Sequence, residues 1–198
     1  MWVDSLPATN DLRGLQRSLT AYQGTSGSTP GYHVALGTLF IRLQDLASAE
    51  QAFRRALELD PKYGKAHLGL GAVALLRKDR PRALGEFKMG AELAGPRSTD
   101  GLRYADLLVA GGDAAQARAW VEAITAKAPD FLPAQVRLAQ IALAERRHDD
   151  CERLLKLVLA RDPAYLDALM LMARLRQAQN DPARWSRSWR APRSCSRV

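Results

Sequence analysis

The sequence repeats itself with a period of 34 residues, and this period constrains the fold more than any other feature. An aspartate recurs at multiples of this step, at Asp11, Asp45, Asp79, Asp113 and Asp181. A small residue keeps the same step, at Gly37, Gly71, Ala105, Ala139 and Ala173. Repeats of this length are typical of proteins whose units each bury too little apolar surface alone and stack into one continuous core.

Each repeat predicts two helices. In the first repeat Leu36, Phe40 and Leu43 lie three or four residues apart, which places them on one face of a helix. A second apolar stripe follows after a break and includes Ala49 and Phe53. The recurring aspartate stands at the break, where its carboxylate can accept hydrogen bonds from the free N–H groups of the second helix. A proline then marks the turn into the next repeat, because proline cannot continue a helix.

This pattern resembles the tetratricopeptide repeat family. The signature residues of the first repeat are His33, Leu36, Gly37, Phe40, Ala49, Phe53, Ala56 and Pro61. Most of them recur in the second repeat, as His67, Leu70, Gly71, Ala74, Ala83 and Phe87. Histidine replaces the tryptophan with which the family motif usually begins, and the third and fourth repeats follow the pattern more loosely. The resemblance implies an all-α fold, a right-handed superhelical solenoid of antiparallel helix pairs.

The register divides the chain into three parts. We expect the repeat array to cover residues 30–183, with repeats at 30–63, 64–97, 98–131 and 132–165 and a partial fifth at 166–183. Residues 1–29 are expected to form an extension with one helix at about 10–23 and a flexible linker. Residues 184–198 form a basic tail that we expect to be disordered.

Charge and composition narrow the class of protein. The net charge is +8, but five arginines in the last fifteen residues leave only +3 for the rest of the chain. A nucleic-acid-binding protein needs its basic stripe on the folded body, so the sequence argues against nucleic acid as a partner. Two cysteines, Cys151 and Cys195, are too few for a disulfide framework and are expected to be unpaired. No apolar run is long enough for a membrane span and no secretory signal is visible, so we expect a cytoplasmic protein.

No motif in the sequence indicates catalysis, a metal or a cofactor. His33 and His67 occupy equivalent positions in neighbouring repeats, with no further ligands at metal-binding spacing. His148 stands beside acidic residues, but adjacent residues of a helix point in different directions. Gly111 and Gly112 lack the preceding strand and the Lys-Ser or Lys-Thr pair of a phosphate-binding loop. We therefore expect no enzyme activity, no metal site and no cofactor.

The family resemblance also implies where a ligand binds. In the family, the first helix of each repeat lines a concave groove that takes extended or helical peptides. Carried over to this chain, the groove is partly apolar and has more basic than acidic residues. Its residues are Val34, Thr38, Ile41 and Arg42; Lys65, Leu68, Ala72 and Leu75; Leu102, Arg103, Asp106 and Val109; Val136, Arg137, Gln140 and Leu143; and Asp167, Met170 and Arg174. The apolar members could instead pack on neighbouring helices, an alternative that the sequence leaves open.

These observations predict a non-catalytic scaffold or adaptor that binds a protein or peptide partner with apolar and acidic residues. Some family members grip the terminal carboxylate of chaperones with Lys and Asn, but Val34 and Thr38 stand at those positions here. Two alternatives stay open, namely the regulatory or docking portion of a larger, truncated enzyme and a nucleic-acid-binding helical repeat. Self-association through uncapped end helices is a further possibility for the partner.

Overall fold

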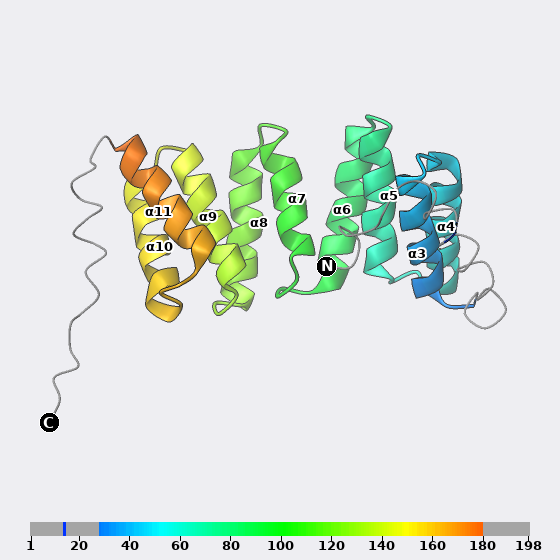
Figure 1. Ribbon diagram of the computed structural model, residues 1–198, viewed down its shortest axis with the longest axis horizontal. Helices are drawn as coiled ribbons and strands as arrows, with labels where there is room; N and C mark the ends of the chain where they lie inside the picture. Colours follow the sequence, from blue (N-terminus) through cyan, green and yellow to red (C-terminus); the bar gives the residue numbers. More distant parts are fainter. Residues whose placement is uncertain (1–13, 15–27, 180–198) are drawn as a thin grey trace, which may run out of the picture. The chain divides into compact units, whose positions relative to one another are not determined.

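The computed structural model describes Gly14 and residues 28–179, and every regular element within 28–179 is an α-helix (Figure 1). The helices are α3 (Pro30–Arg42), α4 (Leu46–Leu59), α5 (Gly64–Leu76), α6 (Arg80–Ala94), α7 (Asp100–Val109), α8 (Ala114–Lys127), α9 (Leu132–Ala144), α10 (His148–Arg161) and α11 (Leu166–Ala178). The predicted all-α, helical-repeat fold is therefore confirmed. The predicted tail at 184–198 lies outside the described residues, as does the helix at about 10–23 apart from Gly14.

Contacts group the described helices into two compact parts, a division that the sequence did not predict. The N-terminal part ends at Gly111 and the C-terminal part begins at Gly112. In the N-terminal part, α3 packs on α4 and α5 packs on α6, while α5 also contacts α3 and α4, and α6 contacts α7. In the C-terminal part, α9 packs on α8 and α10, and α11 packs on α10 and α9. Each part thus buries its apolar stripes by stacking successive helices.

One aromatic ring organises the core of the N-terminal part. Phe53 on α4 is 1% exposed and packs with Ala49, Leu70 and Val73. A Cβ atom added at Gly37 of α3 would lie 2.6 Å from this ring, and one added at Gly69 of α5 would lie closer still. The ring therefore fills a space between α3 and α5 that exists only because both positions are glycine.

The core of the C-terminal part is built around α10. Cys151, Leu155 and Val158 share one buried face of this helix. They pack in one cluster with residues of α9 and α11, among them Ala139 and Met172. Cys151 occupies the small-residue position that Ala49 holds in the first repeat, so its thiol serves as a packing group.

The turns within the repeats share one backbone conformation. Gln44, Lys78, Gly112 and Arg146 follow one another at the 34-residue step, and all four have positive φ angles, between 59° and 86°. After three of them the next N–H group reaches back to a carbonyl oxygen five residues earlier, as Asp79 does to Ala74 at 2.9 Å. A left-handed residue with this hydrogen bond is a standard way to end an α-helix.

The recurring aspartates cap the second helices, as the sequence predicts. Asp45 accepts a hydrogen bond from the N–H group of Ser48 at 3.0 Å, and Asp113 accepts one from Gln116 at 3.1 Å. Asp79 caps α6 in the same way. In the fourth repeat Arg147 stands in this position and provides no side-chain cap. Asp45, Asp79 and Asp113 thus recur in the sequence because each accepts a hydrogen bond from a free N–H group at the start of a second helix.

Candidate functional site

Part of the predicted peptide-binding face is open to solvent in the N-terminal part. Leu75 on α5 and Val109 on α7 keep 40% and 39% of their surface exposed although both are large and apolar. The exposed polar and charged members there are Thr38, Arg42, Lys65 and Arg103. We call these six residues the open face. In the C-terminal part, Asp167, Met170 and Arg174 of α11 are exposed.

Three predicted face residues do not reach the surface. Leu68, Leu102 and Val136 are each less than 9% exposed and belong to the core. The methyl groups of Leu68 lie against Gly90, where α6 approaches α5 closely enough to cover them. Their burial favours the alternative that these three residues pack on neighbouring helices.

The remaining predicted residues are half-buried. Val34 and Ile41 pack against the core of the N-terminal part, and Leu143 packs against the core of the C-terminal part. Asp106 and Arg137 already take part in interactions within the chain. Ala72 and Gln140 are also only partly accessible. Of the predicted face residues, those of the open face and of α11 thus have the most accessible surface.

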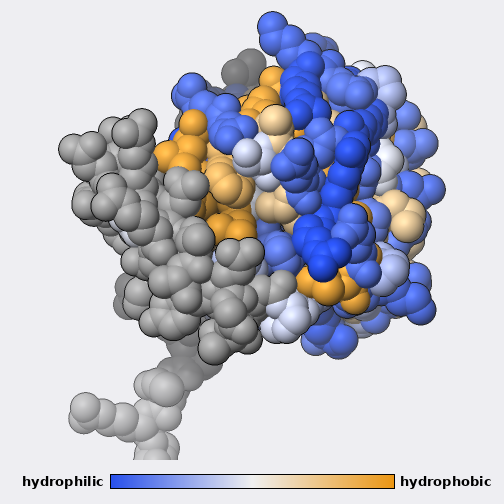
Figure 2. All heavy atoms as spheres, turned by 90° about the vertical axis from the view of Figure 1, so that its right-hand side faces the viewer, coloured by the Kyte–Doolittle hydropathy of each residue, from blue (hydrophilic) through white to orange (hydrophobic). Residues whose placement is uncertain are grey.

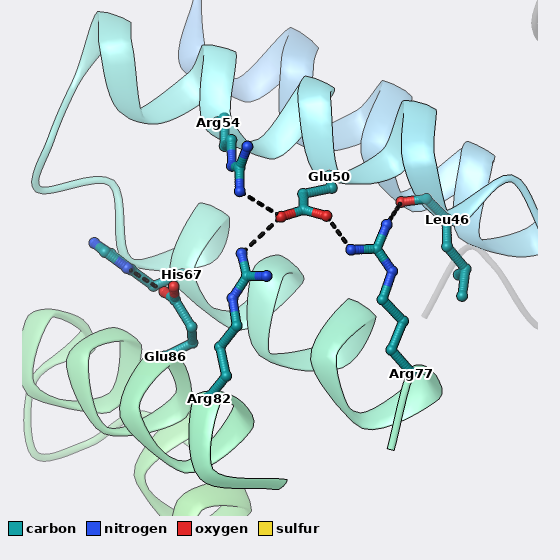
Figure 3. A network of polar contacts seen from close by, with 7 residues as sticks. All are labelled: Leu46, Glu50, Arg54, His67, Arg77, Arg82 and Glu86. Carbon is teal, nitrogen blue, oxygen red and sulfur yellow. Dashed lines mark hydrogen bonds and ion pairs between the residues drawn. The ribbon is translucent and has the colours of Figure 1, made fainter. Parts of the chain in front are cut away.

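A polar network that sequence reasoning missed lies between α4 and the next repeat (Figure 3). The carboxylate of Glu50, with a side chain only 9% exposed, accepts hydrogen bonds from Arg54 at 2.6 Å and Arg82 at 2.7 Å, and also from Arg77. Arg77 donates to the carbonyl oxygen of Leu46 as well, at 3.2 Å. The hydrogen bond from Arg82 is the main reason why the pKa of Glu50 lies below its usual range.

The network is balanced in charge, so it does not form a site for an anion. Asp79 and Glu86 lie near the Arg82 guanidinium and favour its charged form. Glu86 also lies 2.8 Å from the Nδ1 atom of His67, and both side chains are largely buried. Three carboxylates therefore surround three guanidinium groups, and the contacts join α4 to α5 and α6. The physical role of the network is to hold consecutive helices together.

A second buried ion pair joins α10 to α11. Arg176, which is 4% exposed, donates two hydrogen bonds to Glu152, at 2.7 Å and 3.1 Å. Together with Lys156 at 2.9 Å, it lowers the pKa of Glu152 to about 2. The neighbouring residue Cys151 shifts in the opposite direction: burial raises the pKa of its thiol to about 11. A neutral, buried thiol is a poor nucleophile.

The described residues offer no assembled chemistry beyond these pairs. Among them, no group of three or more His, Cys, Asp and Glu side chains could hold a metal ion. The part of the chain that the structure covers also lacks any helix long and apolar enough to cross a membrane. At the end where α3 and α4 lie, apolar surface runs beside strongly hydrophilic surface (Figure 2).

Comparisons with known proteins agree with this geometry. Residues 34–96 match the family model described as tetratricopeptide repeat, whereas no curated protein sequence matches the chain. The solved structure of PilW, described as a widely conserved type IV pilus biogenesis factor, is 17% identical with a TM-score of 0.68, over 90% of this chain and 83% of that one. PilF of Pseudomonas aeruginosa is 16% identical with a TM-score of 0.66, over 90% and 81% of the two chains.

A third structure is YrrB, described as a TPR protein with an unusual peptide-binding site. It is 15% identical to this chain with a TM-score of 0.57, and the match covers 84% of this chain and 86% of that one. The family model confirms the predicted resemblance to the tetratricopeptide repeat over residues 34–96, and these structures share the fold. At such identities the structures establish the fold alone.

Proposed function

We propose that this tetratricopeptide-repeat chain is a non-catalytic scaffold that binds a peptide or protein segment on the open face of α3, α5 and α7. The observation that carries the proposal is the exposure of Leu75 and Val109, which occupy the same register position on successive first helices. Exposed apolar residues that recur on one face, rimmed by polar ones, are typical of a surface that a partner covers.

The charges of the open face define the chemistry of the partner. Arg42, Lys65 and Arg103 are all exposed, and the face as we define it has no acidic member. A ligand with apolar side chains for Leu75 and Val109 and with carboxylates near the basic residues would complement this surface. Peptide binding is also what the description of YrrB states for that protein.

A photo-crosslinking experiment tests the proposal directly. A photoreactive amino acid would replace Leu75 in one chain and Met89 in another, and both chains would be exposed to a lysate of the source organism. Met89 is a matched control because it is equally apolar and 47% exposed, but lies on the second helix α6. We expect a discrete cross-linked partner only from position 75, and the cross-linked segment would then be synthesised as a peptide.

Affinity measurements with that peptide complete the test. Leu75→Asp and Val109→Asp should each weaken binding by roughly 10-fold or more, because each places a charge against an apolar anchor of the ligand. Arg103→Glu should weaken binding and reduce its dependence on salt concentration. Met89→Asp should leave the affinity unchanged. Equal cross-linking from positions 75 and 89, or unchanged affinity in the Leu75→Asp chain, would refute the assignment of the face.

A further inference from the structure

Two repeat junctions use the same register positions with opposite charges. At the first junction Glu50 of α4 contacts Arg77 and Arg82 of the following repeat. At the third junction, two repeats later, Arg118 of α8 takes the position of Glu50. Its guanidinium group lies 2.9 Å from the carboxylate of Glu145 in the following repeat. Glu145 stands in the register position of Arg77, and Asp150 stands in that of Arg82.

We propose that this reversal of charge prevents the first and third junctions from exchanging partners. The apolar interfaces of all repeats follow one pattern of small and large positions, so charge adds a second means of telling the interfaces apart. If α4 stacked on the fourth repeat, Glu50 would face Glu145 and Asp150. If α8 stacked on the second repeat, Arg118 would face two arginines. An exchange of partners between these two junctions would therefore bring like charges into contact at both of them, and such contacts oppose the wrong partner.

The burial of these groups makes the discrimination effective. The side chains of Glu50 and Glu145 are only 9% and 21% exposed, so water screens their interactions less than it screens those of surface charges. The partner charges are also held in place. Arg77 is anchored on the Leu46 carbonyl oxygen, and Arg147 bridges Glu145 and Asp150 at 2.7 Å each.

The second junction differs from both. Leu84 of α6 stands in the register position of Glu50 and Arg118, so no charge is present there. Arg80 instead donates a hydrogen bond to the carbonyl oxygen of Leu107 on α7, at 2.6 Å. The first three junctions therefore have an acidic, an apolar and a basic residue at one position. At the fourth junction this position is acidic again, but Glu152 of α10 pairs there with Arg176, which is not in the register position of Arg77 or Arg82.

The test uses three variants of the full chain. Arg77→Glu/Arg82→Asp gives the second repeat the charges of the fourth and so reproduces the wrong order at the first junction. Arg77→Gln/Arg82→Asn is its neutral control. Adding Glu50→Arg to the charge-reversed chain restores opposite charges with the polarity found at the third junction. Thermal unfolding would be followed by circular dichroism at low salt and at 1 M NaCl.

We expect the neutral chain to unfold roughly 3–6 °C below the wild type, and the charge-reversed chain about 5 °C lower again. The triple variant should regain most of the loss, and the spread should narrow at high salt. If the charge-reversed chain does not fold, the deciding result is whether the triple variant folds. Equal unfolding temperatures for the neutral and charge-reversed chains, or no recovery in the triple variant, would overturn the proposal.

Discussion

A methyl group added at Gly69 should have opposite effects in the presence and absence of the Phe53 ring. Alanine is a better helix former than glycine by about 1 kcal/mol, so Gly69→Ala would stabilise α5 if space were available. The ring of Phe53 occupies that space, because an added Cβ atom would lie less than 3 Å from it. Overpacking of a filled core costs about 1–3 kcal/mol, so Gly69→Ala should lower the stability of the wild type by about 1 kcal/mol.

Removal of the Phe53 ring should reverse the sign of the effect of Gly69→Ala on stability. Phe53→Ala alone should cost about 3–5 kcal/mol, because the ring is almost fully buried and its loss leaves a cavity. In that background the methyl group at Gly69 meets no ring, and the helix-forming preference of alanine remains. The double variant should therefore be about 1 kcal/mol more stable than Phe53→Ala, which gives a coupling energy of about 2 kcal/mol between the two positions.

Urea unfolding of the four chains, followed by circular dichroism, measures this coupling. Gly85→Ala is the matched control, because Gly85 lies on α6 with no atom within 4 Å of an added Cβ. That substitution should stabilise both backgrounds by about 1 kcal/mol. The reasoning would be refuted if Gly69→Ala stabilised the wild type as Gly85→Ala does, because the ring would then not exclude a side chain from α5.

Three further predictions follow from single residues. Lys78→Gly should raise the urea midpoint by the equivalent of about 0.5–1 kcal/mol, since glycine adopts the left-handed conformation of Lys78 without steric cost; a lower midpoint would contradict this. In a Cys195→Ser chain, Cys151 should not react with Ellman's reagent at pH 8 until the protein unfolds, because burial raises its pKa to about 11. The ionised form of Glu152 should contribute stability above pH 4.5 that is lost as the pH falls toward about 2, so the Glu152→Gln chain should show a weaker loss of stability in acid; identical profiles would exclude this contribution.

The helices and their ends were predictable because the signals that set them are local. Asp45 caps α4 through the N–H group of a residue three positions later, and Asp113 caps α8 in the same way. The small residues were also readable, since Gly37 and its counterparts keep one place in every repeat. The period did not reveal that the described helices divide into two parts between Gly111 and Gly112. This division depends on contacts between helices.

The candidate site was predictable only in part. Leu68 and Leu75 are both leucines on the same helix and both were expected on the ligand face, yet one is buried and the other is exposed. The difference arises from Gly90, which lets α6 approach α5 and cover Leu68. The ion pair between Glu50 and Arg82 was missed because charged residues at helix surfaces are common, and only stacking decides which of them meet.

The sequence by itself determined that this chain forms paired helices in a 34-residue register, because caps, turns and apolar stripes act over a few residues. The tertiary structure decided which side chains of those helices are covered and which charges are paired. Both depend on how closely neighbouring helices approach, and a single glycine or ring on another helix sets that distance. Leu75 and Val109 of the open face are among the large apolar residues that neighbouring helices leave exposed.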